Sequence, residues 1–200
     1  MADDVAAAVA AAVAALRQGD LVVLPTDTVY GVAADPRVAG AEARIRQAKG
    51  RDEDKPIPLL AADVEGVTAA GFPMDEAQRR LANRFWPGPL TLVLGAVGRP
   101  EGIRVPACDT ARAIIRACGG LLRVTSANRS GEPPALTAMA AAAALGPSVA
   151  LVLDDGPSPG GVASSVVAVA AGRVRIIRDG AIAAEEIERT AGGAIPCLNA

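Results

Sequence analysis

The chain contains no histidine, and this absence excludes several kinds of chemistry at once. Histidine is the commonest general base of enzymes, the partner in Ser–His and Cys–His couples and a frequent metal ligand. The three cysteines form no CxxC pair, and an odd number of them argues against a disulfide framework. The sequence therefore predicts chemistry that depends on carboxylates, hydroxyls, cations or the positioning of substrates.

Lysine is almost as scarce, because eighteen of the twenty basic residues are arginine. Both lysines, Lys49 and Lys55, lie in the segment KGRDEDK, with Arg51 between them. Lysine presents a compact point charge, whereas arginine presents a planar fork. Two lysines in one segment of a chain that otherwise uses arginine indicate contact with phosphate. The alternative is a solvated loop whose charge complements the C-terminus of the preceding helix.

Aromatic residues are limited to Tyr30, Phe72, Phe85 and Trp86, so the core is expected to consist of Val, Leu, Ile and Ala. The net charge of −2 argues against a broad electrostatic footprint for nucleic acid. The first apolar run, Val5–Leu16, is too short to cross a bilayer and lacks the flanks of a signal peptide. These features predict a cytoplasmic protein with no membrane partner.

The pattern of apolar runs predicts a single α/β domain over residues 1–200, with an unpatterned tail after about residue 192. Helices are expected after a cap at Asp3 or Asp4, over 75–85, and after a cap at Asp109. Strands at 165–170 and 174–177 are joined by a short turn, which makes them an antiparallel hairpin. Strands that alternate with helices, interrupted by a hairpin, predict a mixed sheet and not a doubly wound one. Neither GxGxxG after the first strand nor GxxxxGK[ST] is present.

Five polar segments punctuate the apolar ones and are candidates for a shared site: LPTDTVYGV (24–32), KGRDEDKP (49–56), FWPGPLTLVL (85–94), TSANRSG (125–131) and GGVASSVV (160–167). The first follows a strand end, where α/β clefts form, and its Asp27 is a candidate to orient a hydroxyl or Mg²⁺. An Asx or ST turn explains the same residues. The third segment is interpreted as structural. The fourth offers hydroxyls and an amide that suit a nucleotide, although a turn uses them equally well.

The ordered set PTDTVYG, KGR…KP, FWPGPLT, SANRSG, GGVASS and a closing RDG resembles the YrdC family of threonylcarbamoyl-AMP synthases over about residues 8–182. The resemblance implies a twisted, mixed parallel and antiparallel sheet with flanking helices around a concave basic cavity. It also implies a reaction in which L-threonine, bicarbonate or CO₂, and ATP give threonylcarbamoyl-AMP and pyrophosphate. That product serves the N6-threonylcarbamoyl modification of adenosine 37 in tRNAs that read ANN codons.

The resemblance also assigns roles to residues of this chain. Catalysis is expected from Lys49 and Arg51. The residues expected to bind ATP are Lys49, Arg51, Lys55, Ser126, Asn128, Pro134 and Arg178. Those expected to bind threonine are Thr28, Arg104, Val124 and Ser164. Mg²⁺ is expected to be held by the ATP phosphates.

The chain departs from the family pattern near the amino-acid pocket. Leu60 stands near a position where family members often have histidine, and Ala163 and Ser165 stand where glutamate and threonine are usual. The fine shape of this pocket and its amino-acid selectivity are therefore left open.

The partners implied by the resemblance are ATP, L-threonine, bicarbonate, a downstream tRNA threonylcarbamoyl transferase, and weakly bound tRNA or double-stranded RNA. Two alternatives remain at this point. One is a related enzyme that adenylates carbamoyl phosphate or another carboxylate. The other is a non-catalytic RNA-binding module of the same fold, against which the few aromatic residues and the acidic net charge argue.

Overall fold

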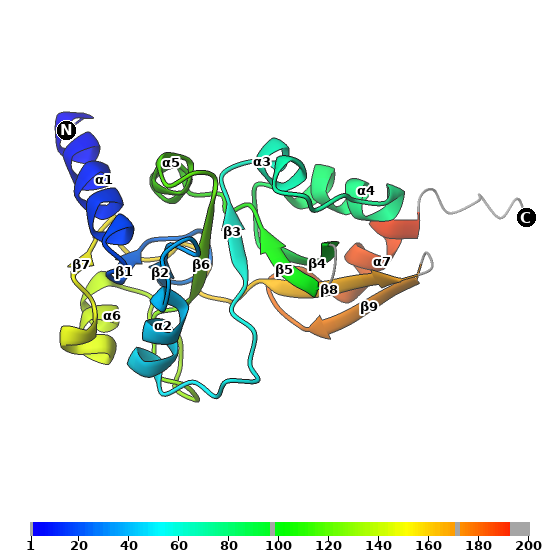
Figure 1. Ribbon diagram of the computed structural model, residues 1–200. Coiled ribbons are helices and arrows are strands. Elements are labelled where there is room, and N and C mark those ends of the chain that lie inside the picture. The colour runs from blue at the N-terminus through cyan, green and yellow to red at the C-terminus, as the bar shows by residue number, and fades with distance from the viewer. Residues whose placement is uncertain (1, 97–98, 171–172, 193–200) are drawn as a thin grey trace, which may run out of the picture.

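A computed structural model describes residues 2–96, 99–170 and 173–192 of the chain (Figure 1). Its described strands form one sheet in the order β7-β1-β2-β6-β3-β5-β4-β8-β9. The strands are β1 (Val22–Leu24), β2 (Gly31–Ala34), β3 (Leu59–Ala61), β4 (Leu90–Ala96), β5 (Arg99–Arg104), β6 (Leu121–Ser126), β7 (Leu151–Val152), β8 (Ser165–Ala170) and β9 (Arg173–Arg178). Three neighbouring pairs, β1/β7, β3/β5 and β4/β8, are parallel and the others antiparallel, so the predicted mixed sheet is confirmed.

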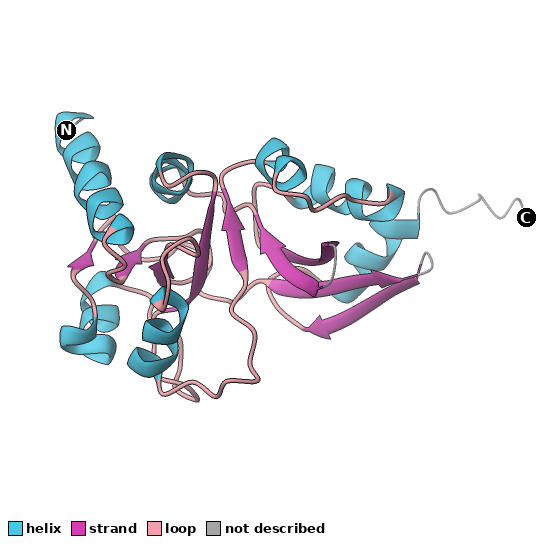
Figure 2. Cartoon of the chain, in the orientation of Figure 1, coloured by secondary structure: helices cyan, strands magenta, loops and turns pink. Residues whose placement is uncertain are grey.

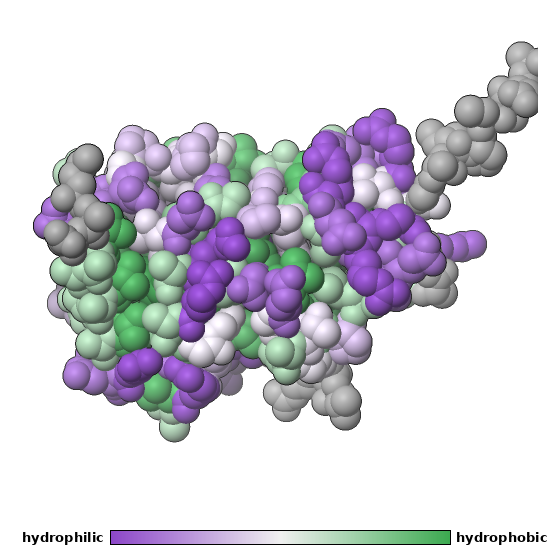
Figure 3. Space-filling model, turned by 90° about the horizontal axis from the view of Figure 1, so that it is seen from above, coloured by the Kyte–Doolittle hydropathy of each residue, from purple (hydrophilic) through white to green (hydrophobic). Residues whose placement is uncertain are grey.

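The helices connect these strands and cover the sheet (Figure 2). They are α1 (Ala2–Arg17), α2 (Ala41–Lys49), α3 (Val64–Ala69), α4 (Glu76–Phe85), α5 (Asp109–Ala117), α6 (Ala138–Leu145) and α7 (Ala184–Gly192), with a short 3₁₀ turn η1 (Gly146–Ser148). No helix within the described residues is long and apolar enough to cross a membrane. Seen from above, hydrophilic residues gather at the end of the molecule that carries the packed helices α4 and α7 (Figure 3).

Three apolar clusters divide the core. Helices α1 and α5 pack against one face of the β1, β2, β3 and β6 region, and α2 and α6 cover the opposite face of β1 and β2. Helices α3, α4 and α7 cover β4, β5 and β8. Aliphatic residues dominate all three clusters, as the shortage of aromatic residues predicts.

Local sequence signals explain several helix ends. Asp75 caps α4 in a capping box with Gln78, and the Thr137 hydroxyl caps α6. Gly50 ends α2 with a φ of 59°, a left-handed conformation that glycine adopts without steric cost. The predicted caps at Asp3, Asp4 and Asp109 are wrong: α1 already begins at Ala2, and Cys108 precedes α5. An acidic residue stabilises the first turn of a helix through the dipole as well as at the cap, so composition alone does not distinguish the two positions.

The sequence did not reveal β2 or α3, which are short and lie next to polar segments. Strand β7 is also short and covers only Leu151–Val152. The β8–β9 hairpin is antiparallel as predicted, although its turn at 171–172 lies outside the described residues. The predicted tail, residues 193–200, also lies outside them.

Gly31, at the start of β2, brings the strand close to its neighbour. A Cβ atom on Gly31 would lie 2.6 Å from Cγ1 of Val124, a buried residue on β6. A methyl group at this position therefore overpacks the joint between β2 and β6.

We expect Gly31→Ala to lower the free energy of unfolding by about 1–3 kcal/mol, the usual cost of overpacking a core. The matched control is Gly95→Ala on β4, where an added Cβ meets no atom within 4 Å. Urea unfolding of both variants measures the difference. Equal stability of the two variants would contradict the steric explanation.

Candidate active site

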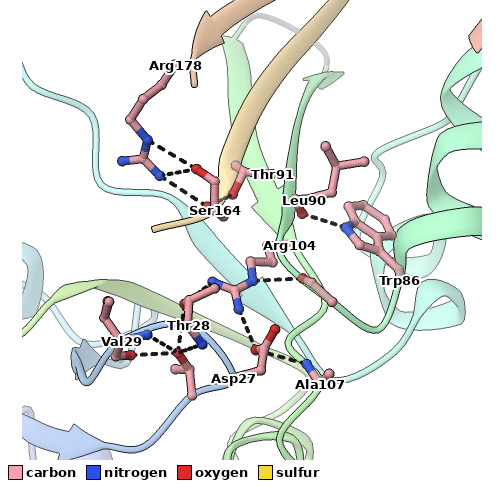
Figure 4. Close-up of polar contacts among 12 residues, drawn as sticks. Asp27, Thr28, Val29, Trp86, Leu90, Thr91, Arg104, Ala107, Ser164 and Arg178 are labelled. Carbon is pink, nitrogen blue, oxygen red and sulfur yellow. Dashed lines mark hydrogen bonds and ion pairs between the residues drawn. The ribbon is translucent and has the colours of Figure 1, made fainter. Parts of the chain in front are cut away.

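The buried guanidinium of Arg104, at the end of β5, connects three segments of the chain (Figure 4). Its Nε donates to the carbonyl of Gly88 at 2.9 Å, its Nη1 donates to the Thr28 hydroxyl at 2.8 Å, and its Nη2 donates to the Asp27 carboxylate. The Arg104 side chain is only 7% exposed. Burial lowers the pKa of Arg104, and the Asp27 carboxylate opposes this effect. The WPGP segment, PTDT and β5 therefore meet at one buried cation.

The β1–β2 loop is held against the loop before β8. A Cβ on Gly160 would lie 2.5 Å from the carbonyl oxygen of Asp27, and the N–H of Gly161 donates to the carbonyl of Thr28 at 2.9 Å. Inside the loop, the Thr26 hydroxyl lies 3.0 Å from the Thr28 hydroxyl. The glycines of GGVASS therefore serve close backbone packing against PTDT.

Ser164 forms a second polar group, with partners from two strands. Its hydroxyl lies 2.8 Å from the Thr91 hydroxyl, and Arg178 donates to both its hydroxyl and its carbonyl, at 3.1 and 2.7 Å. Ser164 and Thr91 are buried. Gly180 packs on this turn so closely that a Cβ there would lie 2.4 Å from backbone atoms of Ser164 and Ser165. This contact explains why the RDG motif ends in glycine, since any larger residue would collide with the backbone.

The two groups lie beside each other at one region of the sheet (Figure 4). Strands β4 and β5 are antiparallel neighbours that pair Leu92 with Ile103, so Thr91 and Arg104 are the next residues on facing strands. Burial is the largest cause of the lowered pKa of both Arg104 and Arg51. The positive charge of Arg178 lowers both pKa values further. The cations of three motifs therefore share one electrostatic environment.

Lys49, the last residue of α2, is buried and anchors the segment that follows β6. Its ammonium donates to the carbonyl of Ser126, to the carbonyl of Asn128 at 2.5 Å and to the Asn128 side-chain oxygen at 3.3 Å. Its own carbonyl accepts from the N–H of Ser130 at 2.8 Å. An ammonium has three N–H donors, so these contacts use all of them. Direct contact with phosphate would require Lys49 to lose at least one of these three hydrogen bonds.

The Asn128 side chain is also used within its loop, because its amide donates to the carbonyls of Arg129 and Glu132 at 2.9 and 2.6 Å. The Ser126 hydroxyl, in contrast, makes no hydrogen bond to any described residue. Ser126 is only partly buried. Of these two residues, Ser126 has a side chain that is available to a ligand.

The remaining cations of the KGRDEDK segment contact their own loop. Arg51 donates to the carbonyls of Lys55 and Pro56 at 3.3 and 3.0 Å. Lys55 is exposed and forms an ion pair with Asp52 at 2.7 Å. A hollow of about 440 Å³ lies beside this segment, lined by Ala43, Arg46, Gln47, Gly50, Arg51, Asp52 and Glu53. A concave basic cavity that encloses the predicted site residues is not shown, and it stays a prediction.

Two predicted site residues are not brought into these groups. The Val124 side chain packs in the core cluster beneath α1 and α5, and Pro134 is exposed. Within the described residues, no three His, Cys, Asp or Glu side chains come together as a metal site. Sequence reasoning missed Thr91, which it interpreted as part of a structural segment. The signal that indicates Thr91 is a polar residue between apolar neighbours in a buried strand.

Comparisons with known proteins show the family and the fold of the chain. The Sua5–YciO–YrdC family, described as "Telomere recombination", matches residues 14–180. A relative from Mycobacterium tuberculosis is 36% identical over 194 residues, which are 92% of this chain and 89% of that protein. The threonylcarbamoyl-AMP synthase of Bacillus subtilis is 35% identical over 197 residues, 92% of this chain and 56% of that one.

The fold is likewise similar to a solved structure. The crystal structure of Pyrococcus abyssi Sua5 complexed with L-threonine has a TM-score of 0.84 and 32% identity, over 92% of this chain and 57% of that one. The chain thus spans little more than half the length of the B. subtilis and P. abyssi proteins.

Lys49 leads to a prediction about pH. Burial, with a smaller contribution from Arg51, lowers its pKa from 10.5 to about 8. Between these pH values the unfolded chain binds more protons than the folded one, so stability rises with pH. We expect the free energy of unfolding of the wild type, relative to Lys49→Met, to increase by about 1 kcal/mol per pH unit from pH 8 to 10.

Urea unfolding at pH 7, 8, 9 and 10 measures this difference, and Lys55→Met is the matched control at an exposed lysine. A constant difference between the wild type and Lys49→Met would show that the Lys49 pKa is not lowered.

Proposed function

Because the chain belongs to the Sua5–YciO–YrdC family, we propose that it is a threonylcarbamoyl-AMP synthase, which condenses L-threonine, bicarbonate or CO₂, and ATP to threonylcarbamoyl-AMP and pyrophosphate. The name of the B. subtilis relative and the threonine complex of P. abyssi Sua5 support this proposal. The observation in this chain that carries it is the buried Arg104, tied to Thr28 and lying beside Ser164 and Arg178. The family pattern assigns three of these four residues to the amino acid and Arg178 to ATP.

On the threonine side, Arg104 supplies the cation that an α-carboxylate needs. A guanidinium has five N–H donors, and three are used by Gly88, Thr28 and Asp27, which leaves two for a carboxylate. We expect the buried hydroxyls of Thr28, Thr91 and Ser164 to contact the rest of the amino acid. Thr91 is added to the residues that the sequence suggested.

On the ATP side, Arg51, Lys55 and Arg178 supply positive charge, and Ser126 supplies a hydroxyl that no other described residue uses. Lys49 contributes by holding the segment from Ser126 to Ser130 in place. ATP enters as its Mg²⁺ complex, in which the phosphate oxygens hold the metal.

The mechanism needs little acid–base chemistry. The threonine amine loses a proton and forms an N–C bond with CO₂, which gives an N-carboxylate. An oxygen of this carboxylate attacks the α-phosphorus, the bond from that phosphorus to the bridging oxygen breaks, and pyrophosphate leaves. The charge that develops lies on phosphate oxygens, so positioning and cations supply most of the catalysis. A chain without histidine is suited to such a reaction.

The product is then consumed by a tRNA threonylcarbamoyl transferase that modifies adenosine 37, and the synthase acts in the cytoplasm. Direct binding of tRNA or double-stranded RNA would be weak, because the net charge is −2. The names of the relatives do not favour an enzyme that adenylates a different substrate or a non-catalytic RNA-binding module.

We expect pyrophosphate release from ATP to require both L-threonine and bicarbonate. A coupled pyrophosphate assay measures it with each substrate left out in turn, and with serine, valine and alanine in place of threonine. Release at an equal rate without an amino acid, or a strong preference for an unrelated acid, would contradict the proposed function.

Variants at two cations test whether the site divides into a threonine side and an ATP side. Arg104→Lys keeps the charge but loses the fork, so we expect threonine affinity to fall about ten- to a hundredfold while ATP affinity stays within about threefold. Lys55→Met is expected to do the reverse. Isothermal titration measures both ligands on both variants, and thermal midpoints check folding. If each substitution lowers the affinities for threonine and ATP equally, this division of the site is wrong.

A further inference from the structure

The carboxylate of Asp27 uses only one of its two oxygens within the described residues. Its Oδ1 accepts from Nη2 of Arg104 and from the backbone N–H of Ala107 at 3.0 Å (Figure 4). Its Oδ2 makes no hydrogen bond or ion pair with any described residue. An ionised carboxylate has about four acceptor positions, so Oδ2 retains its full capacity. The Asp27 side chain is 12% exposed, and Oδ2 is not among the fully buried atoms, so a ligand can reach it from solvent.

Asp27 and Arg104 are held at a fixed separation. The backbone of Asp27 is pressed against Gly160, and the next residue is hydrogen-bonded to Gly161. The guanidinium is fixed on its other sides by Gly88 and Thr28. Two opposite charges, both mostly buried, therefore form a rigid dipole in the site.

We propose that Asp27 binds the α-ammonium group of the amino-acid substrate through Oδ2, while Arg104 binds its α-carboxylate. This inference rests on the proposed function. A free amino acid is a zwitterion, and burying its ammonium group without a counter-charge is costly. Arg104 and Arg178 lie nearby and repel an ammonium. Asp27 is the carboxylate that the described structure places directly on Arg104, and it leaves one oxygen available.

A simpler role for Asp27 is to neutralise the buried Arg104. The two roles differ in what they predict for a ligand that lacks the ammonium group. If Asp27 only neutralises Arg104, its removal lowers the affinity for every ligand with an α-carboxylate. If Asp27 contacts the ammonium, its removal affects only ligands that carry one.

The test compares L-threonine with (2S,3R)-2,3-dihydroxybutanoate, in which a hydroxyl replaces the ammonium group. Isothermal titration measures both ligands on the wild type, on Asp27→Asn and on the control Asp155→Asn. The amide oxygen introduced by Asp27→Asn keeps an acceptor for the N–H of Ala107. Asp155 is an acidic residue that accepts from Thr110 and does not contact Arg104.

We expect the wild type to bind threonine at least about tenfold more tightly than the hydroxy acid. In Asp27→Asn this preference should disappear through a loss of threonine affinity alone, whereas Asp155→Asn should keep it. Equal losses for the two ligands in a folded Asp27→Asn variant would overturn the inference and leave the proposed function intact. Equal binding of the two ligands by the wild type would overturn it even if the variant fails to fold. Absence of threonine binding in the wild type would overturn the proposed function as well.

Discussion

A cation that is removed from water must find acceptors for its N–H groups, and this requirement brings the distant polar segments of the chain together. Arg104 meets it with a carbonyl, a hydroxyl and a carboxylate that come from two different loops. Lys49 meets it with three oxygens from the last residue of β6 and the segment that follows. Loss of either cation would leave several of these groups without a partner, which is more costly than the loss of a surface charge.

The use of lysine instead of arginine at position 49 has a structural explanation. Its compact ammonium fits among three closely spaced oxygens, a geometry that a planar guanidinium cannot reproduce. Arg51 instead spans the carbonyls of its own loop, and Lys55 remains exposed beside Asp52. The three cations of this short segment therefore make different contacts, although they form a single cluster in the sequence.

Close backbone packing completes the arrangement. Gly160 and Gly180 each lie against the backbone of another motif at distances that a Cβ would not allow. These contacts fix the turns that carry Asp27 and Ser164. Polar groups held in this way are oriented before a substrate arrives, which reduces the entropic cost of binding.

The sequence by itself determined the class of fold and the candidate segments. Hydrophobic periodicity and turn residues are local signals, so they indicated helices such as the one over 75–85, the β8–β9 hairpin and a mixed sheet. The ordered motifs predicted Thr28, Arg104, Ser164 and Arg178 as site residues, and the structure places these residues in neighbouring groups.

Only the tertiary structure decided which groups contact one another. Segments far apart in the chain determine the order of the strands, the contact of Thr91 with Ser164 and the burial of Lys49. They also determine that Asp27 uses only Oδ1 among the described residues. A residue type at a given position indicates what a side chain can donate or accept. Which partner it meets, and whether water is excluded from the contact, depends on long-range packing that no local pattern records.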